Sequence, residues 1–237
     1  MAWLSWLPQF MKAPLTNGDR IRMSAKFGLV YAQCGVFLKA ETLLAEAALA
    51  VYWELGKLNE ALLLQQSVAT TCEQYLGREN PDTLRALHKL STTLWQKGQF
   101  SAAKKLQMEV VDGITGALGP KHADTVEAMN GLGRTVMKFG RQEDILEAFQ
   151  LSTKALEGMK ESLGNERLLA TYAKENIARA SCLIGEQTLL NKALQLMEEV
   201  IATRKARMGK EAPWTPMAMG NMAVVLGALG RVQEAES

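Results

Sequence analysis

The stretch Leu76-Gly77-Arg78-Glu79-Asn80-Pro81-Asp82-Thr83-Leu84 opens a unit that recurs along the chain. Its opening pair, leucine or methionine followed by glycine, returns at Leu118-Gly119, Leu163-Gly164 and Met208-Gly209. The spacings are 42, 45 and 45 residues, and a second glycine lies 22 residues after each opening residue, at Gly98, Gly140, Gly185 and Gly230. A period of this length indicates a supersecondary unit that cannot bury its apolar face alone, so that neighbouring units stack into one core.

Each unit begins with an apolar helix. Between its two glycines, apolar residues recur at helical rather than strand spacing, as in Leu87, Leu90 and Leu94. In a later copy these positions hold Lys174, Ile177 and Ser181, and we expect that helix to pack less tightly.

The ends of this first helix are also marked in the sequence. Asn80 suits the N-cap, Pro81 the first helical position, and Asp82 the positive end of the helix dipole. His122 and Ala212 begin weaker versions of the same start, and the glycine that closes each helix is suited to a left-handed conformation.

A second helix follows in each unit and is marked by an alanine. These alanines are Ala61, Ala103, Ala148 and Ala193. The first two follow their glycines by five residues and the last two by eight. Because loop insertions cost little free energy, we expect the three extra residues to lie in the turn between the helices.

Two-helix units with small residues at the eighth and twentieth positions resemble tetratricopeptide repeats. The 42-residue form that begins Leu-Gly-x-x-x-Pro-Asp-Thr-Leu at Leu76 is similar to the repeats of kinesin light chains. It is also similar to the repeat domain of fungal nucleotide-binding, immune-receptor-like proteins. The resemblance covers residues 24–237, with residues 1–23 as an irregular amino-terminal segment. It implies an all-α fold, a right-handed superhelical solenoid of antiparallel helix pairs with about five units.

Both ends depart from the repeat pattern. Gly35 and Gly56 lie only 21 residues apart, so we expect the first two units to be merged by a half-period deletion, with one fused helix over 36–55. A short break near 45–48 is the alternative. At the other end, Ser237 follows closely on the start of a second helix, and the last first helix, expected over 216–229, lacks its partner. We expect either a longer natural protein or self-association through this uncapped carboxyl end.

The composition excludes several functions. Lys plus Arg (27) nearly balances Asp plus Glu (25), so no global charge favours nucleic acid or an anionic membrane. Three scattered cysteines and two histidines indicate neither a disulfide framework nor a metal site, and favour reduced thiols in the cytoplasm.

The sequence contains no phosphate-binding loop and no apolar run that would span a bilayer. The cluster of basic residues from Arg204 to Lys210 is interpreted as the solvated end of a helix. We therefore expect no catalysis and no cofactor.

The resemblance places partner-binding residues on the first helices, which line a concave groove in such arrays. The positions that would face the groove include His88, Lys89, Thr92, Asn130, Arg134, Lys138, Asn176, Arg179 and Asn221. Asn176 and Asn221 match the asparagine that bonds a peptide backbone in the family, whereas Lys89 and Gly131 replace it in two copies. Arg134 and Arg179 occupy equivalent places in adjacent units, so a carboxylate or an acidic peptide is the matching ligand.

These observations predict a noncatalytic scaffold that binds a segment of another protein in its groove. The alternative is a detached ligand-sensing repeat domain of a larger signalling NTPase of the fungal immune-receptor-like type. A partner made of protein or peptide is common to both hypotheses.

Overall fold

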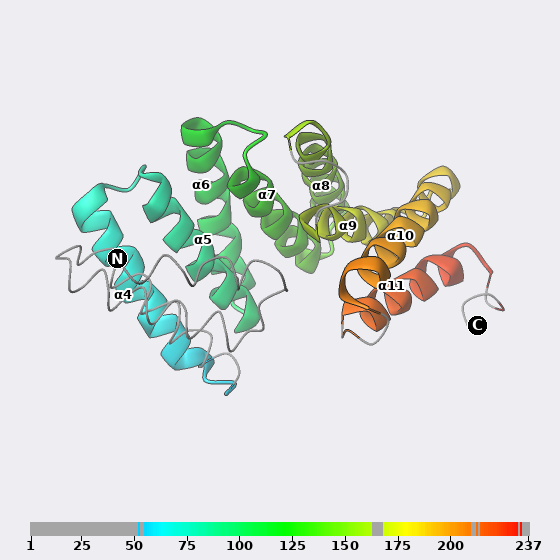
Figure 1. Cartoon of the computed structure of the whole chain (residues 1–237), viewed down its shortest axis with the longest axis horizontal. Helices are drawn as coiled ribbons and strands as arrows, with labels where there is room; N and C mark the ends of the chain where they lie inside the picture. The colour runs from blue at the N-terminus through cyan, green and yellow to red at the C-terminus, as the bar shows by residue number, and fades with distance from the viewer. Residues whose placement is uncertain are drawn as a thin grey trace, which may run out of the picture. The chain divides into compact units, whose positions relative to one another are not determined.

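The computed structural model describes residues 52, 55–162, 168–209, 212, 214–231 and 233. Within these ranges the chain forms α-helices and one short 3-10 helix, with no strand (Figure 1). The chain divides into two compact units, residues 1–97 and 98–237. The expected all-α class is confirmed for the described residues.

The described part of the first unit is a pair of packed helices, α4 (Leu58–Leu76) and α5 (Pro81–Gln96). The start of α5 is built as its sequence predicts, because Asn80 Oδ1 accepts a hydrogen bond of 2.9 Å from the Asp82 backbone N–H and Pro81 is the first helical residue. At the other end of α5, Lys97 Nζ donates to Asn59 Oδ1 of α4 at 2.6 Å.

The second unit contains six α-helices in its described residues. They are α6 (Phe100–Leu118), α7 (Ala123–Val136), α8 (Gln142–Ser162), α9 (Leu168–Ile184), α10 (Gln187–Met208) and α11 (Trp214–Ala228), with the 3-10 helix η1 (Met137–Phe139) after α7. Each α-helix packs against the next one along the chain. In addition, α9 contacts both α7 and α11, so these three first helices of successive repeats lie in one row. That row carries most of the predicted partner-binding residues.

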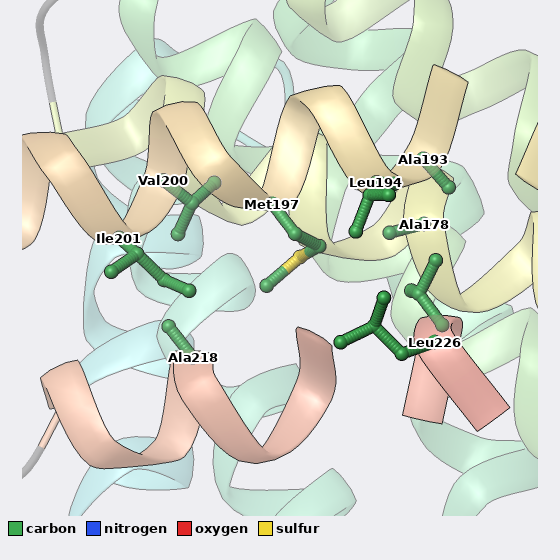
Figure 2. Packing of buried hydrophobic residues seen from close by; sticks show 9 residues of the cluster. Ala178, Ala193, Leu194, Met197, Val200, Ile201, Ala218 and Leu226 are labelled. Atoms are coloured by element: carbon green, nitrogen blue, oxygen red, sulfur yellow. The ribbon is translucent and has the colours of Figure 1, made fainter. Parts of the chain in front are cut away.

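Apolar side chains form a packed core between the last three α-helices of this unit. Between α9, α10 and α11 the core includes Ala178 of α9, Met197 and Val200 of α10, and Ala218 and Leu226 of α11 (Figure 2). Figure 2 shows Met197 projecting from α10 toward α11. Burial of a Val, Leu or Met side chain contributes roughly 1.5–3 kcal/mol, so the packing of these helices stabilises the stacked repeats.

The alanines that mark the second helices are fully buried. Ala61, Ala103, Ala148 and Ala193 each have no exposed surface. Opposite Ala148, Gly133 of α7 approaches α8 closely enough that an added Cβ would lie 3.4 Å from the Ala148 carbonyl oxygen. Small residues therefore set the distance between the helices of a pair.

The position of the three extra residues in the longer units was predicted wrongly. The helices α6, α8 and α10 all begin two residues after their glycines, at Phe100, Gln142 and Gln187. The additional residues lengthen the second helix from 19 residues in α6 to 21 in α8 and 22 in α10. Three residues make nearly one helical turn, so they extend the helix while the marking alanine stays on the buried side.

The prediction that α9 packs loosely was also wrong. Lys174, Ile177 and Ser181 are all buried. The Lys174 ammonium pairs with Glu199 of α10 at 2.6 Å, and the Ser181 hydroxyl donates to the Ile177 carbonyl of its own helix at 2.9 Å. Polar groups with local partners are thus accommodated in a packed helix.

The last first helix is α11, which begins two residues earlier than expected and ends one residue earlier. Its inner side is buried at Ala218, Val225 and Leu226, whereas Met217 and Met219 are exposed. The predicted irregular segment 1–23, the merged repeat with its fused helix over 36–55, and the residues beyond Gln233 lie outside the described residues.

Candidate partner-binding face

Five of the predicted site residues lie on the row of first helices in the second unit. Asn130 and Arg134 are on α7, Asn176 and Arg179 on α9, and Asn221 on α11. We call this surface the first-helix face. Since α9 contacts both α7 and α11, the structure brings these residues onto adjoining helices.

Arg134 and Arg179 form the basic part of this face. Arg134 is half-buried, whereas Arg179 is exposed. Burial lowers the pKa of the Arg134 guanidinium, and the nearby positive charge of Arg179 lowers it further. Two cations that are close enough to disfavour each other attract an anion strongly, because an anion relieves the repulsion of both.

One asparagine side chain of this face makes an internal hydrogen bond that the sequence did not indicate. Asn176 Nδ2 donates a hydrogen bond of 3.1 Å to the backbone carbonyl of Asn130, from α9 to α7. The Asn130 side chain is only 7% exposed, and its amide nitrogen and oxygen have no hydrogen-bond partner among the described residues. A buried amide without partners costs about 1–3 kcal/mol, so this group has unused hydrogen-bonding capacity beside the two arginines.

Asn221 is committed to a contact within the protein. Its Nδ2 donates to Glu175 Oε1 of α9 at 3.1 Å. Glu175 is in turn paired with Arg204 of α10, with both N–O distances at 2.8 Å. The predicted peptide-binding role of Asn221 therefore competes with this internal bond.

The interpretation of Arg204 as part of a solvated cluster was wrong, since its side chain is 1% exposed. Sequence reasoning missed both Arg204 and Glu175 as an interacting pair. A signal was present, because Arg204 continues the buried series of Met197, Val200 and Ile201 at helical spacing. A charge on the apolar side of a helix indicates a buried partner.

The other four predicted site residues lie outside the first-helix face, on η1 and on α5. Lys138 is exposed on η1, with its ammonium 5.7 Å from the centre of the Phe100 ring. His88, Lys89 and Thr92 belong to α5 in the first unit. The Thr92 hydroxyl donates to the His88 carbonyl of its own helix at 3.1 Å, which uses that hydroxyl locally. These three residues remain predicted partner contacts of the first unit.

The chemistry of the described residues offers no metal centre, because no group of three or more metal-binding side chains occurs among them. His122 has the helix-start role predicted for it, with Nδ1 accepting from the Asp124 backbone N–H at 3.2 Å. Burial raises the pKa of the Cys182 thiol, which disfavours the reactive thiolate. None of the α-helices that the structure describes has the length and apolarity needed to cross a bilayer.

Comparison with known proteins supports the architecture. A family model described as "Tetratricopeptide repeat" matches residues 48–113. The fold is similar to a crystal structure of kinesin light chain TPR-like repeats from Podosopora anserina, with a TM-score of 0.65, 24% identity, and coverage of 84% of this chain and 90% of that chain. The fold is that of a tetratricopeptide-repeat solenoid.

Two further solved structures share this tetratricopeptide-repeat fold. A single-substitution variant of the Podosopora anserina repeats has a TM-score of 0.63 and 22% identity, and the match covers 94% of this chain and 92% of that chain. BtubC (BKLC) from P. vanneervenii has a TM-score of 0.67 and 15% identity, with 94% and 88% coverage. No curated protein sequence matches the chain. At these identities the likeness establishes the fold, and function rests on the residues of the first-helix face.

Proposed function

We propose that this chain is a noncatalytic scaffold that binds an acidic segment of another protein on the first-helix face, over α7 and α9. Tetratricopeptide repeats serve in general as protein-interaction scaffolds. The observation that carries the proposal is the approach of Arg134 and Arg179 on adjacent first helices, beside the buried and unpartnered amide of Asn130.

The acidic character of the ligand follows from the charges. A guanidinium binds a carboxylate through two parallel hydrogen bonds, and such charge-assisted bonds are about twice as strong as neutral ones. The half-buried position of Arg134 strengthens the attraction, since a lower local dielectric weakens screening. We expect the Asn130 side chain, whose amide atoms are buried without a partner, to turn outward and donate to a backbone carbonyl of the bound segment, which favours a peptide over a small anion.

A selection experiment tests this function. A displayed library of random twelve-residue peptides is panned against the purified chain, and the enriched sequences are compared with those from the R134Q/R179Q variant. We expect Asp and Glu to be enriched with the natural chain and the enrichment to be lost with the variant. Affinities of the selected peptides should fall by roughly tenfold or more, as the loss of one good charge-assisted contact implies.

The matched control is K105Q/K192Q, which removes the same charge from exposed positions on α6 and α10. This control should bind the selected peptides as the natural chain does. Equal loss in the control would mean that only net charge matters, and selection of peptides without acidic residues would contradict the proposal. The alternative function as a sensor domain of a signalling NTPase would use the same face, and it stays a prediction.

A further inference from the structure

We infer that Arg204 is a positioning residue that keeps Arg179 available to an acidic ligand, by holding Glu175 away from it. This inference rests on the proposed function of the first-helix face. It concerns a residue on the neighbouring second helix, α10, that does not itself belong to that face.

Glu175 and Arg179 stand four residues apart on α9, with the acid on the amino-terminal side. This spacing and order favour an ion pair within a helix. In the structure that pair is not made. Arg179 is exposed and has no ion pair or hydrogen bond with another residue that the structure describes, although its charge acts on Arg134.

Arg204 outcompetes Arg179 for Glu175 because it offers a two-pronged contact in a buried setting. Its two terminal nitrogens each lie 2.8 Å from one carboxylate oxygen of Glu175. The Arg204 guanidinium also donates to the Trp214 carbonyl of α11 at 2.9 Å and lies 5.7 Å from the centre of the Tyr172 ring. An exposed pair between Glu175 and Arg179 would have more mobile partners and more screening by water.

Asn221 completes the arrangement by donating to the same carboxylate at 3.1 Å. Glu175 therefore receives hydrogen bonds from α10 and α11, and the Arg204 guanidinium balances its negative charge. Removing the Arg204 guanidinium would leave the Glu175 carboxylate without its partner charge. We expect the carboxylate then to pair with Arg179, four residues later on the same helix.

In the preceding repeat, too, no free carboxylate stands one helical turn before the arginine, but for a different reason. The residue four before Arg134 is Asn130, which carries no charge, and it occupies the position 45 residues before Glu175. Neither arginine is thus preceded, one helical turn earlier on its own helix, by a free carboxylate. In α7 the sequence supplies a neutral residue, and in α9 Arg204 neutralises an acidic one.

The test compares R204M with R204M/E175Q. In R204M the freed Glu175 carboxylate should pair with Arg179, whereas the double variant has no acid to release. The first measurement needs no ligand: the modification of Arg179 by phenylglyoxal, followed by mass spectrometry. We expect the rate at Arg179 to fall about twofold in R204M, as an exposed helical ion pair implies, and to return in R204M/E175Q.

The second measurement is the affinity for an acidic peptide from the library selection. We expect it to weaken roughly tenfold in R204M, because a carboxylate then lies beside the ligand's own, and to recover in the double variant. If the natural chain binds no acidic peptide, the proposed function fails, while the labelling result still decides whether Arg204 controls Arg179.

Thermal unfolding followed by circular dichroism establishes that each variant is folded. If R204M does not fold, R204Q takes its place, because a glutamine amide removes the positive charge that neutralises Glu175 while it can still donate a hydrogen bond, and it should lower Arg179 labelling in the same direction. Unchanged labelling of Arg179 in the folded Arg204 variant would overturn the inference. So would labelling that stays low in R204M/E175Q, since Glu175 would then not be the cause.

Discussion

Gly133 of α7 lies against Ser152 of α8 so closely that a Cβ added to the glycine would be 3.0 Å from the Ser152 hydroxyl oxygen. The Ala148 carbonyl oxygen, at 3.4 Å from the same point, belongs to the backbone and cannot move aside as a side chain can. The packing of this helix pair therefore depends on the missing side chain at residue 133.

We predict that G133L lowers the free energy of unfolding by roughly 1–3 kcal/mol, because overpacking forces side chains off their rotamers and shifts backbone. The matched control is G116L, at an exposed position of α6, where an added Cβ meets no atom within 4 Å. That change should be neutral or stabilising, since leucine is the better helix former. Urea denaturation of both variants measures the difference, and equal effects would contradict the packing argument.

The N-cap at Asn80 gives a prediction for the first unit. N80A removes the side-chain acceptor for the Asp82 backbone N–H and should cost about 1 kcal/mol of stability. N80D, which keeps an acceptor oxygen, should retain most of the stability that the cap contributes. The measurement is chemical denaturation followed by helical circular dichroism, and an N80D variant as unstable as N80A would show that the cap is not the cause.

Acid should remove a stabilising contact at the start of α8. Hydrogen bonds from Arg141 hold the pKa of Asp144 below its usual range, with a further contribution from Lys104. Because the folded-state pKa is lowered, the stabilisation is present above the unfolded aspartate pKa of about 3.9 and is lost as pH falls through the folded value.

The natural chain should therefore exceed D144N in stability near neutral pH, and the two stabilities should converge as the solution is acidified below about pH 3.9. Thermal unfolding across this range measures the convergence. The control D112N, at an exposed position of α6, should leave the pH dependence unchanged. A constant gap between D144N and the natural chain at every pH would rule out the charge as the origin.

The outer side of α11 predicts self-association. This helix contains no charged residue, and its exposed apolar side chains include Met217, Met219 and Val224, the last 61% exposed. A helix that is apolar all round is normally buried, and we expect a second copy of the chain to cover this side.

Sedimentation equilibrium should show concentration-dependent dimerisation of the natural chain that M219K/V224K abolishes. The control M108K, which alters an exposed methionine of α6, should dimerise normally. If the natural chain stays monomeric at high concentration, or if M108K dissociates it equally, α11 is not the contact.

Much of the fold was predictable because its determinants are local in the sequence. The cap at Asn80, the closing glycines and the marking alanines act within one or two helices, and each recurs in the next copy. Gly140, for example, takes a left-handed conformation with φ at 70°, as the residue that ends a first helix requires. The three added residues were misplaced because lengthening a helix by almost one turn leaves the repeat pattern as intact as lengthening a loop does.

The candidate site was less predictable, since its properties depend on residues from different repeats. Asn176 and Asn221 were expected to face a peptide, yet each donates to a residue 46 positions earlier, on the neighbouring first helix. Whether a polar side chain is available to a partner depends on which internal acceptor lies within about 3 Å of it, and no local pattern specifies that distance.

The sequence by itself determined the helical repeat, the buried alanines and the equivalence of Arg134 with Arg179, because regular spacing and small side chains are sufficient to stack like units. Only the tertiary structure decided that Arg204 is buried and that it, rather than Arg179, binds Glu175. Both arginines carry the same charge, and the choice between them follows from burial, geometry and the bonds that α11 adds, which exist only once α9, α10 and α11 are packed together.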